Sequence, residues 1–287
     1  MEYYYIFCGV PFRVAAPTSL WEDKYSPKFA CAPCAPVVNI EITSSTQLPA
    51  PLGKLLGHRG EKYIWREGTT ITRLTHDSFQ TNPHMLCSYQ LEQPGLIHCV
   101  AREDAWKWAT GSSFLWPGVS LPQLLLYHRA LVFHASYIAH QGQGILFTAP
   151  SRTGKSTQAA LWETCRGAQI LNGDKAAVKL EAKPVVYSMP FCGTSGICEN
   201  VTLPLRCIVV LSQAKDNTVR RLGIQEALSM LSPNVFSDRL IAEEWSKTLL
   251  LLVDLVASVP VYSLACTPDV RAVEALEAAL AQDGLKS

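Results

Sequence analysis

The segment from Ala149 to Thr157 has the residue types and spacing of a loop that binds phosphate. It matches the pattern G-x-x-x-x-G-K-[ST] at every fixed position except the first, where Ala149 stands in place of glycine. An apolar run precedes the loop, and residues with helix-forming character follow it. A chance Gly-Lys-Ser-Thr after a strand is the alternative, but both flanking elements are of the kind that phosphate binding requires.

Each fixed position of this loop has a physical role. Backbone N–H groups and the positive end of the following helix attract a polyphosphate, and Gly154 allows the close approach. Lys155 would place its charge on the β- and γ-phosphates of ATP, and the Ser156 hydroxyl would ligate Mg²⁺. The expected nucleotide-binding set is therefore the run Ser151, Arg152, Thr153, Gly154, Lys155, Ser156 and Thr157.

Asp174 is the first acidic residue that follows the loop at the end of an apolar strand, in Ile170-Leu171-Asn172-Gly173-Asp174. Strands of an α/β sheet end at a shared edge, so Asp174 is expected to face the γ-phosphate. There it could ligate Mg²⁺ or accept the proton of an attacking hydroxyl. The alternative is an ordinary turn aspartate after glycine.

Strands and crossover helices must hold these residues, and their alternation predicts an α/β layer fold. The expected strands are 132–139, 145–148, 169–172, 178–180, 185–188, 208–211 and 261–264. The expected helices are 121–131, 155–166 ending at Gly167, 224–231, 238–257, and a last one with Thr267 as N-cap and Pro268 at its first position.

The N-terminal part of the chain has the short alternating stretches of an antiparallel sheet. One expected hairpin joins Lys62–Arg66 to Thr70–Leu74, and a second joins Cys87–Leu91 to Leu96–Val100 through a turn at Gln93-Pro94-Gly95. Length favours one large or two ordinary domains. We therefore expect a smaller β-rich domain over residues 1–115 and a phosphate-loop domain over residues 116–287.

The composition excludes several other classes of protein. Of 287 residues, 48% are hydrophobic and 17% are charged, which is typical of a compact globular fold. A net charge of +1 gives no reason to expect nucleic-acid binding, so an anion must be bound locally. The apolar run Leu249–Val259 is too short to span a membrane, and the aromatic, acidic start is unlike a signal peptide. We expect a cytoplasmic protein with reduced thiols.

The order of these pieces resembles the HPr serine kinase/phosphorylase family, within the phosphoenolpyruvate-carboxykinase-like group of phosphate-loop enzymes. The resemblance rests on His134-Ala135-Ser136, the loop, Asn172-Gly173-Asp174 and the glycine-rich turn Cys192-Gly193-Thr194-Ser195-Gly196. It covers residues 134–211 and implies a P-loop kinase fold. It also implies that Lys155 and Ser156 take the nucleotide phosphates and Mg²⁺ and that His134 lies beside the active site.

Asp174 falls on a position that belongs to an adjacent acidic pair in the bifunctional kinases of that family. Here Gly173 and Lys175 flank it, so one carboxylate remains. Thr157 also replaces a glutamate expected after Ser156. These departures argue against the reverse, phosphorolytic activity, and Glu199 could replace the missing metal-binding carboxylate.

Several further residues have both functional and ordinary interpretations. The turn Gly193–Gly196 could wrap phosphate oxygens or serve only as a flexible turn. Arg206, Arg220 and Arg221 could stabilise the transferred phosphoryl group or be solvated. Cys31 and Cys34 form one C-x-x-C in a proline-rich stretch, and a structural zinc site needs a second pair or well-spaced histidines.

The sequence thus predicts an ATP- and Mg²⁺-dependent phosphotransferase whose acceptor is a hydroxyl, foremost a serine of a protein or peptide. Lys155, Asp174 and His134 are the expected catalytic residues, and Ser156, Asp174 and Glu199 the expected metal ligands. A small-molecule kinase and a nucleotide-binding regulatory or scaffold protein without catalysis stay open. A phosphoenolpyruvate carboxykinase is less favoured, because 287 residues is short for that enzyme. Homo-oligomerisation also stays open.

Overall fold

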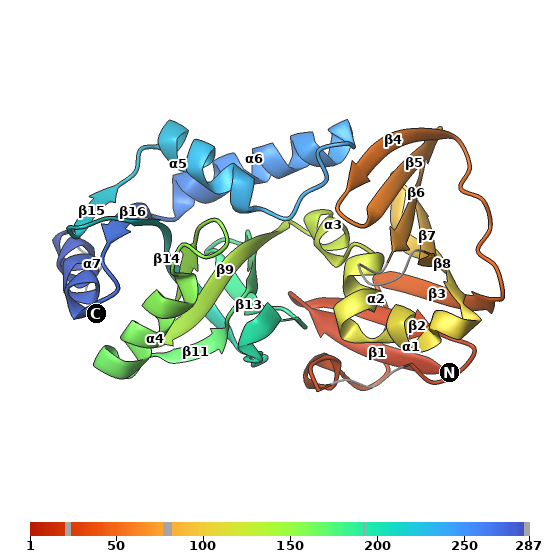
Figure 1. Ribbon diagram of the computed structural model, residues 1–287, viewed down its shortest axis with the longest axis horizontal. Helices are drawn as coiled ribbons and strands as arrows, with labels where there is room; N and C mark the ends of the chain where they lie inside the picture. The colour runs from red at the N-terminus through yellow and green to blue at the C-terminus, as the bar shows by residue number, and fades with distance from the viewer. Residues whose placement is uncertain (21–23, 77–81, 192, 284–287) are drawn as a thin grey trace. The chain divides into compact units, whose positions relative to one another are not determined.

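The computed structural model describes residues 1–20, 24–76, 82–191 and 193–283. It is a mixed α/β protein with two large sheets and, within those residues, seven α-helices (Figure 1). The chain divides into two compact units. The first unit comprises Met1–His128 with Asp238–Ala242, and the second comprises Arg129–Ser237 with the chain from Glu243 onward. The domain boundary expected from the sequence, after residue 115, precedes this division.

The first unit contains an eight-stranded sheet in the order β1-β2-β3-β8-β7-β6-β5-β4. Its strands are β1 Glu2–Phe7, β2 Val10–Ala15, β3 Val38–Ser45, β4 Lys54–Arg59, β5 Lys62–Glu67, β6 Thr70–His76, β7 Pro83–Gln90 and β8 Gln93–Arg102. The hairpin expected between β5 and β6 is confirmed. We expected an antiparallel sheet, and this prediction is wrong for one strand. β3 runs parallel to both β2 and β8.

The turn predicted at Gln93-Pro94-Gly95 is wrong, since these residues begin β8 and the turn lies at Leu91-Glu92. Gly95 has a different reason to be glycine. A Cβ there would lie 2.8 Å from the Val37 carbonyl oxygen, so the glycine permits a close approach of two backbones.

Three short helices close this unit: α1 Trp106–Thr110, α2 Ser112–Gly118 and α3 Leu121–Leu126. The helix expected over 121–131 therefore ends five residues early. Arg129 adopts a left-handed backbone (φ 60°), and Ala130 already starts the next strand, where Val132 and Phe133 favour extended structure.

The second unit is built on a sheet in the order β10-β9-β12-β13-β14-β16-β15, with β11 paired to β9 and β10 also paired to β14. Its strands are β9 Ala130–His140, β10 Gln143–Thr148, β11 Gln169–Asn172, β12 Lys175–Lys179, β13 Val185–Ser188, β14 Thr202–Gln213, β15 Thr218–Arg221 and β16 Val261–Cys266.

Strand direction fixes which residues meet in this unit. Both β10 and β11 run antiparallel to β9, so they point the same way and end at the same edge. β14 and β16 run parallel to β10 and end there too. The loop after β10 and the Gly173-Asp174 turn after β11 therefore share one edge of the sheet.

The helices of this unit are α4 Lys155–Arg166, α5 Ile224–Leu231, α6 Ala242–Ser258 and α7 Val270–Gln282. α4 ends as predicted at Gly167 (φ 64°), whereas α6 begins four residues later than expected. The predicted N-cap of α7 is wrong. Asp269 holds that position, because its carboxylate accepts a hydrogen bond from the Arg271 N–H at 2.9 Å.

Burial of apolar side chains fixes α4 against the sheet. Trp162 of α4 and Leu276 of α7 pack with Phe147, Val209 and Leu264 in one buried cluster. Burying each such side chain contributes about 1.5–3 kcal/mol. The N-terminus of α4, and with it the loop, is thereby held at the sheet edge. No helix in the described part of the chain has the length and apolar character needed to cross a bilayer.

Candidate active site

The loop between β10 and α4 has two residues in the left-handed backbone region. Gly154 (φ 115°) immediately precedes α4, and its carbonyl accepts a hydrogen bond from the Gln158 N–H at 2.9 Å. Arg152 (φ 66°) is the second. Left-handed backbone is thus needed at Gly154 and Arg152 rather than at Ala149, which explains how alanine can occupy the first position.

Lys155 is the first residue of α4, and its side chain folds back onto the loop. Its Nζ donates to the carbonyl oxygens of Ala149 (3.0 Å) and Pro150 (3.2 Å), and the residue is 7% exposed. Burial lowers the pKa of this amine, against the opposing effect of the Asp174 charge. The hydroxyl-bearing residues Ser151, Ser156 and Thr157 are exposed around it.

Asp174 forms an ion pair with each of two cationic or ionisable neighbours. Its Oδ1 lies 3.2 Å from His134 Nδ1, and its Oδ2 lies 2.7 Å from Lys175 Nζ. Burial of the carboxyl raises its pKa, but the hydrogen bond from His134 and the charge of Lys175 outweigh it, and the pKa is held well below the usual value. Asp174 is therefore a carboxylate at neutral pH.

His134 connects this carboxylate to the loop. Its other ring nitrogen, Nε2, lies 3.5 Å from Ser151 Oγ, and its ring meets Phe236 edge to face. The Asp174 carboxylate accepts a hydrogen bond from His134 Nδ1–H. The neutral imidazole therefore carries its proton on Nδ1, and Nε2 is an acceptor that faces the loop. The side chains of Ser151, His134 and Asp174 thus form a chain of polar contacts along the sheet edge.

Asn172 organises this site, although sequence reasoning gave it no role. Its buried Oδ1 accepts from the N–H groups of Asp174 and Lys175, each at 3.0 Å. Its Nδ2 donates to Ser188 Oγ and to the carbonyls of Met189 and Phe191. The signal was present, because an asparagine directly before Gly-Asp is typical of a side chain that caps its own turn.

The glycine-rich turn packs directly on the carboxylate. Gly193 has φ 56°, and a Cβ on it would lie 3.0 Å from Asp174 Cγ. A Cβ on Gly173 would lie 2.4 Å from Ser195 Cβ. The described part of the turn, Gly193–Gly196, therefore touches the Gly173-Asp174 turn, and both glycines make that approach possible; Cys192 lies outside the described residues.

Lys175 is another residue to which the sequence analysis gave no role in the site. There it was noted only as a departure from the acidic pair of the resembled family. Its ammonium group lies 4.7 Å from the Phe191 ring centre and 5.2 Å from that of Phe236, in addition to its ion pair with Asp174. Two aromatic faces and a carboxylate therefore position the cation beside the site.

Glu199 lies near this turn through its backbone. Its N–H donates to the Leu171 carbonyl at 2.8 Å, and the preceding residue, Cys198, bridges to Asn172. Its role as a metal ligand stays a prediction.

Three predicted arginines lie away from the loop. Arg206 is aligned with the start of β10, at the end of the sheet opposite the loop. Arg220 and Arg221 pair with the first half of β16, and their guanidinium groups form ion pairs with Glu226 and Asp283.

Cys31 and Cys34 belong to the first unit and contact each other. Burial, followed by the hydrogen bond to Cys34, raises the pKa of the Cys31 thiol, which makes it a weaker nucleophile. Their role stays open.

The donor set at the sheet edge fits a magnesium ion that arrives with a nucleotide. Within the described residues, no group of three or more His, Cys, Asp and Glu side chains comes together. Mg²⁺ commonly uses one or two carboxylates and completes its shell with substrate phosphates and water. The exposed Ser156 hydroxyl and the ionised Asp174 carboxylate are ligands of the required type.

Comparisons with known proteins add little to this geometry. No protein-family model and no curated protein match the chain. Among solved structures, the chain is similar to the HPr(Ser) kinase/phosphatase from Coxiella burnetii, with 13% sequence identity and a TM-score of 0.30. The match covers 53% of this chain and 95% of that one. The structural relationship is distant.

Proposed function

We propose that this protein is a phosphotransferase that moves the γ-phosphate of Mg-ATP to a hydroxyl group, foremost a serine of a protein or peptide. One observation carries the proposal. A loop with the Gly-Lys-Ser-Thr sequence of phosphate binding shares a sheet edge with an ionised Asp174, and His134 contacts both. Phosphoryl transfer needs this combination of an anion cradle and a nearby proton acceptor.

In this proposal the loop and Lys155 bind the phosphates. The N–H groups at the start of α4 and the positive end of the helix attract them. Lys155 would exchange its two carbonyl contacts for phosphate oxygens, which are stronger acceptors for a cation. Ser156 and Asp174 would hold Mg²⁺, which supplies positive charge to the phosphates when it is bound.

His134 and Asp174 act as a pair in the transfer. A carboxylate with a strongly lowered pKa is a weak base, so Asp174 is better suited to orient His134 and to balance its charge. His134 Nε2 faces the loop and would accept the proton of the attacking hydroxyl. The same division of roles operates wherever a carboxylate orients a catalytic histidine.

The choice of serine as acceptor rests on the resemblance to the HPr serine kinase family. A hydroxyl on a small molecule would satisfy the same site chemistry. The direction of transfer rests on the single carboxylate, because Gly173 and Lys175 flank Asp174 where that family has an adjacent acidic pair, and the site lacks the extra base of the phosphorolytic reaction.

The proposal is tested with γ-labelled ATP, Mg²⁺ and arrays of serine-, threonine- and tyrosine-containing peptides, with hydrolysis to phosphate followed in parallel. We expect Lys155→Ala to lower transfer at least about a hundredfold, because it removes the charge on the phosphates. His134→Gln should lower the rate by a similar factor, because it removes the proton acceptor. Lys183→Ala, at an exposed lysine of the same unit, is the matched control and should leave the rate unchanged.

A nucleotide-binding regulatory protein is the second candidate, and Lys175 is the observation that favours it. Its ammonium group already neutralises the single carboxylate of the site. If Mg-ATP binds but neither transfer nor hydrolysis exceeds the Lys155→Ala background, the regulatory function stands and the kinase proposal is wrong.

A further inference from the structure

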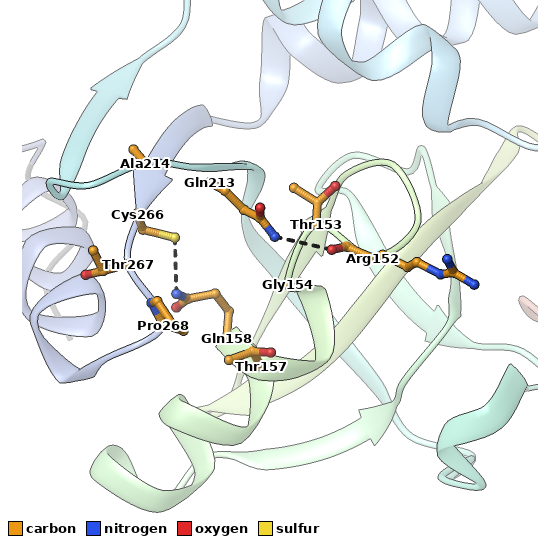
Figure 2. A pocket seen from close by; sticks show the side chains of 10 residues that line it. All are labelled: Arg152, Thr153, Gly154, Thr157, Gln158, Gln213, Ala214, Cys266, Thr267 and Pro268. Atoms are coloured by element: carbon orange, nitrogen blue, oxygen red, sulfur yellow. Dashed lines mark hydrogen bonds between the residues drawn. The ribbon is translucent and has the colours of Figure 1, made fainter.

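A cavity of about 410 Å³ lies beside the phosphate loop in the second unit. It is lined by the loop and the start of α4, by the end of β14 and by the residues that follow β16 (Figure 2). Its lining residues include Gln158, Gln213, Ala214, Cys266, Thr267 and Pro268. Its volume is in the range of small-molecule sites, about 300–1,000 Å³.

Gln158 lines this cavity and carries an unsatisfied hydrogen-bond acceptor. The residue is 2% exposed, and its Nε2 donates to Cys266 Sγ at 3.3 Å. Its Oε1 is buried and has no hydrogen-bond partner among the described residues. An unmet buried acceptor costs about 1–3 kcal/mol, so a ligand N–H that reached it would recover this energy.

The walls of the cavity are held in place by hydrogen bonds. Asn217 Nδ2 donates to Thr267 Oγ1 at 2.8 Å, and the Thr267 N–H donates to Asn217 Oδ1 at 3.0 Å. Across the cavity, Gln213 Nε2 donates to the Arg152 carbonyl, as Figure 2 shows. A site that is held open in this way loses less entropy on binding.

We propose that this cavity, termed the base cavity, binds the adenine of the nucleotide and that Gln158 Oε1 accepts a hydrogen bond from its exocyclic amino group. The inference rests on the proposed function, since the phosphates must occupy the adjoining loop. Ala214 and Pro268 supply apolar surface for the faces of the ring.

The chemistry of the lining favours adenine over guanine. Adenine presents an amino donor where guanine presents a carbonyl oxygen, which would face Gln158 Oε1 as a second acceptor. Guanine also carries two N–H donors that a carboxylate would satisfy, and none of the residues that line the cavity in the described chain is Asp or Glu.

Calorimetric titration of the full chain with Mg²⁺ complexes of ATP, GTP, ITP and inorganic tripolyphosphate tests the inference. ITP carries a carbonyl oxygen in place of the adenine amino group. We expect ATP to bind about tenfold tighter than GTP, ITP and tripolyphosphate, as one hydrogen bond to a buried acceptor allows. Gln158→Leu should weaken the binding of ATP about tenfold and leave the affinity for tripolyphosphate unchanged. Gln169→Leu, at an exposed glutamine on β11, should change neither.

The outcomes separate the two proposals. If neither ATP nor tripolyphosphate binds to the wild type, the proposed function fails and the base cavity loses its basis. If tripolyphosphate binds as tightly as ATP, or ITP and GTP bind as tightly as ATP, phosphate binding stands and the base cavity is refuted. These comparisons use the wild type, so they decide the question even if Gln158→Leu does not fold.

Discussion

Replacing Lys175 by methionine removes one charge from the Asp174 site and keeps the length of the side chain. Lys175 Nζ lies 2.7 Å from Asp174 Oδ2, and the two side chains are 22% and 20% exposed. His134 would remain as the other neighbour of the carboxylate. The variant therefore measures what the cation contributes to holding Asp174 ionised.

The magnitude follows from the distance and the burial. Two unit charges 2.7 Å apart attract by about 6 kcal/mol at an effective dielectric constant of about 20. Desolvation of both groups offsets most of that attraction. Losing one partner of a fully buried pair costs about 3–5 kcal/mol, and an exposed pair contributes about 0–1 kcal/mol. For this partly buried pair we expect Lys175→Met to lower the free energy of unfolding by about 2 kcal/mol at pH 7.

The effect should depend on pH in one direction. The pKa of Asp174 is lowered in the folded protein, so its stabilisation is present above the unfolded pKa of about 3.9 and is lost as the pH falls. In Lys175→Met the pKa of Asp174 rises toward the unfolded value, so the variant has less stabilisation to lose as the pH falls. The difference in unfolding free energy between the wild type and the variant should therefore be constant above the unfolded pKa of about 3.9 and shrink only below it, as the Asp174 carboxyl of the variant becomes protonated.

Urea unfolding followed by tryptophan fluorescence, at pH 7, 5, 4 and 3, measures both effects, with buried Trp162 reporting on this unit. Lys179→Met is the matched control on the same strand, because Lys179 lies 3.4 Å from the half-exposed Glu181. It should cost no more than about 0.5 kcal/mol. A Lys175→Met effect that equals the control, or one that grows between pH 5 and pH 3, would refute the reasoning.

Two further substitutions test the parts that hold Asp174. Gly193→Ala should cost about 1–2 kcal/mol for its left-handed backbone and lower phosphoryl transfer at least about tenfold, since the new Cβ would press on Asp174. Gly142→Ala, with a similar φ and open space, should cost stability alone, as urea unfolding and transfer assays of both variants will show. Asn172→Asp should lower the unfolding free energy by about 2 kcal/mol, about 1 kcal/mol for each of the two N–H groups that Nδ2 shares among three acceptors. An unfolding free energy of Asn172→Asp equal to that of the wild type at pH 7 would contradict this expectation.

Local sequence signals predicted the elements that position the loop. α4, β11, β13 and α5 have the expected bounds, because each combines a strong apolar pattern with a local stop such as Gly167. Non-local arrangements were not predictable in this way. The parallel placement of β3 depends on partners distant in sequence.

The candidate site shows the same limit at the level of side chains. The placement of Asp174 at the loop edge followed from strand direction, whereas its contact with His134 was suggested only by the family resemblance. The alignment of Arg206 with the far end of the sheet depends on strand register, which its own sequence does not encode. Asn172 carried a recognisable turn signal, but the three acceptors of its Nδ2 group lie 16 to 19 residues further along the chain.

The presence of Lys175 beside a single carboxylate has consequences beyond one ion pair. Two adjacent carboxylates would repel each other and raise one pKa, giving the site a base of intermediate strength. A carboxylate beside an ammonium group stays ionised over the whole physiological pH range, so Asp174 can no longer supply that base. In the proposed reaction, proton transfer would then depend on His134, whose Nε2 faces the loop because its Nδ1 is paired with Asp174.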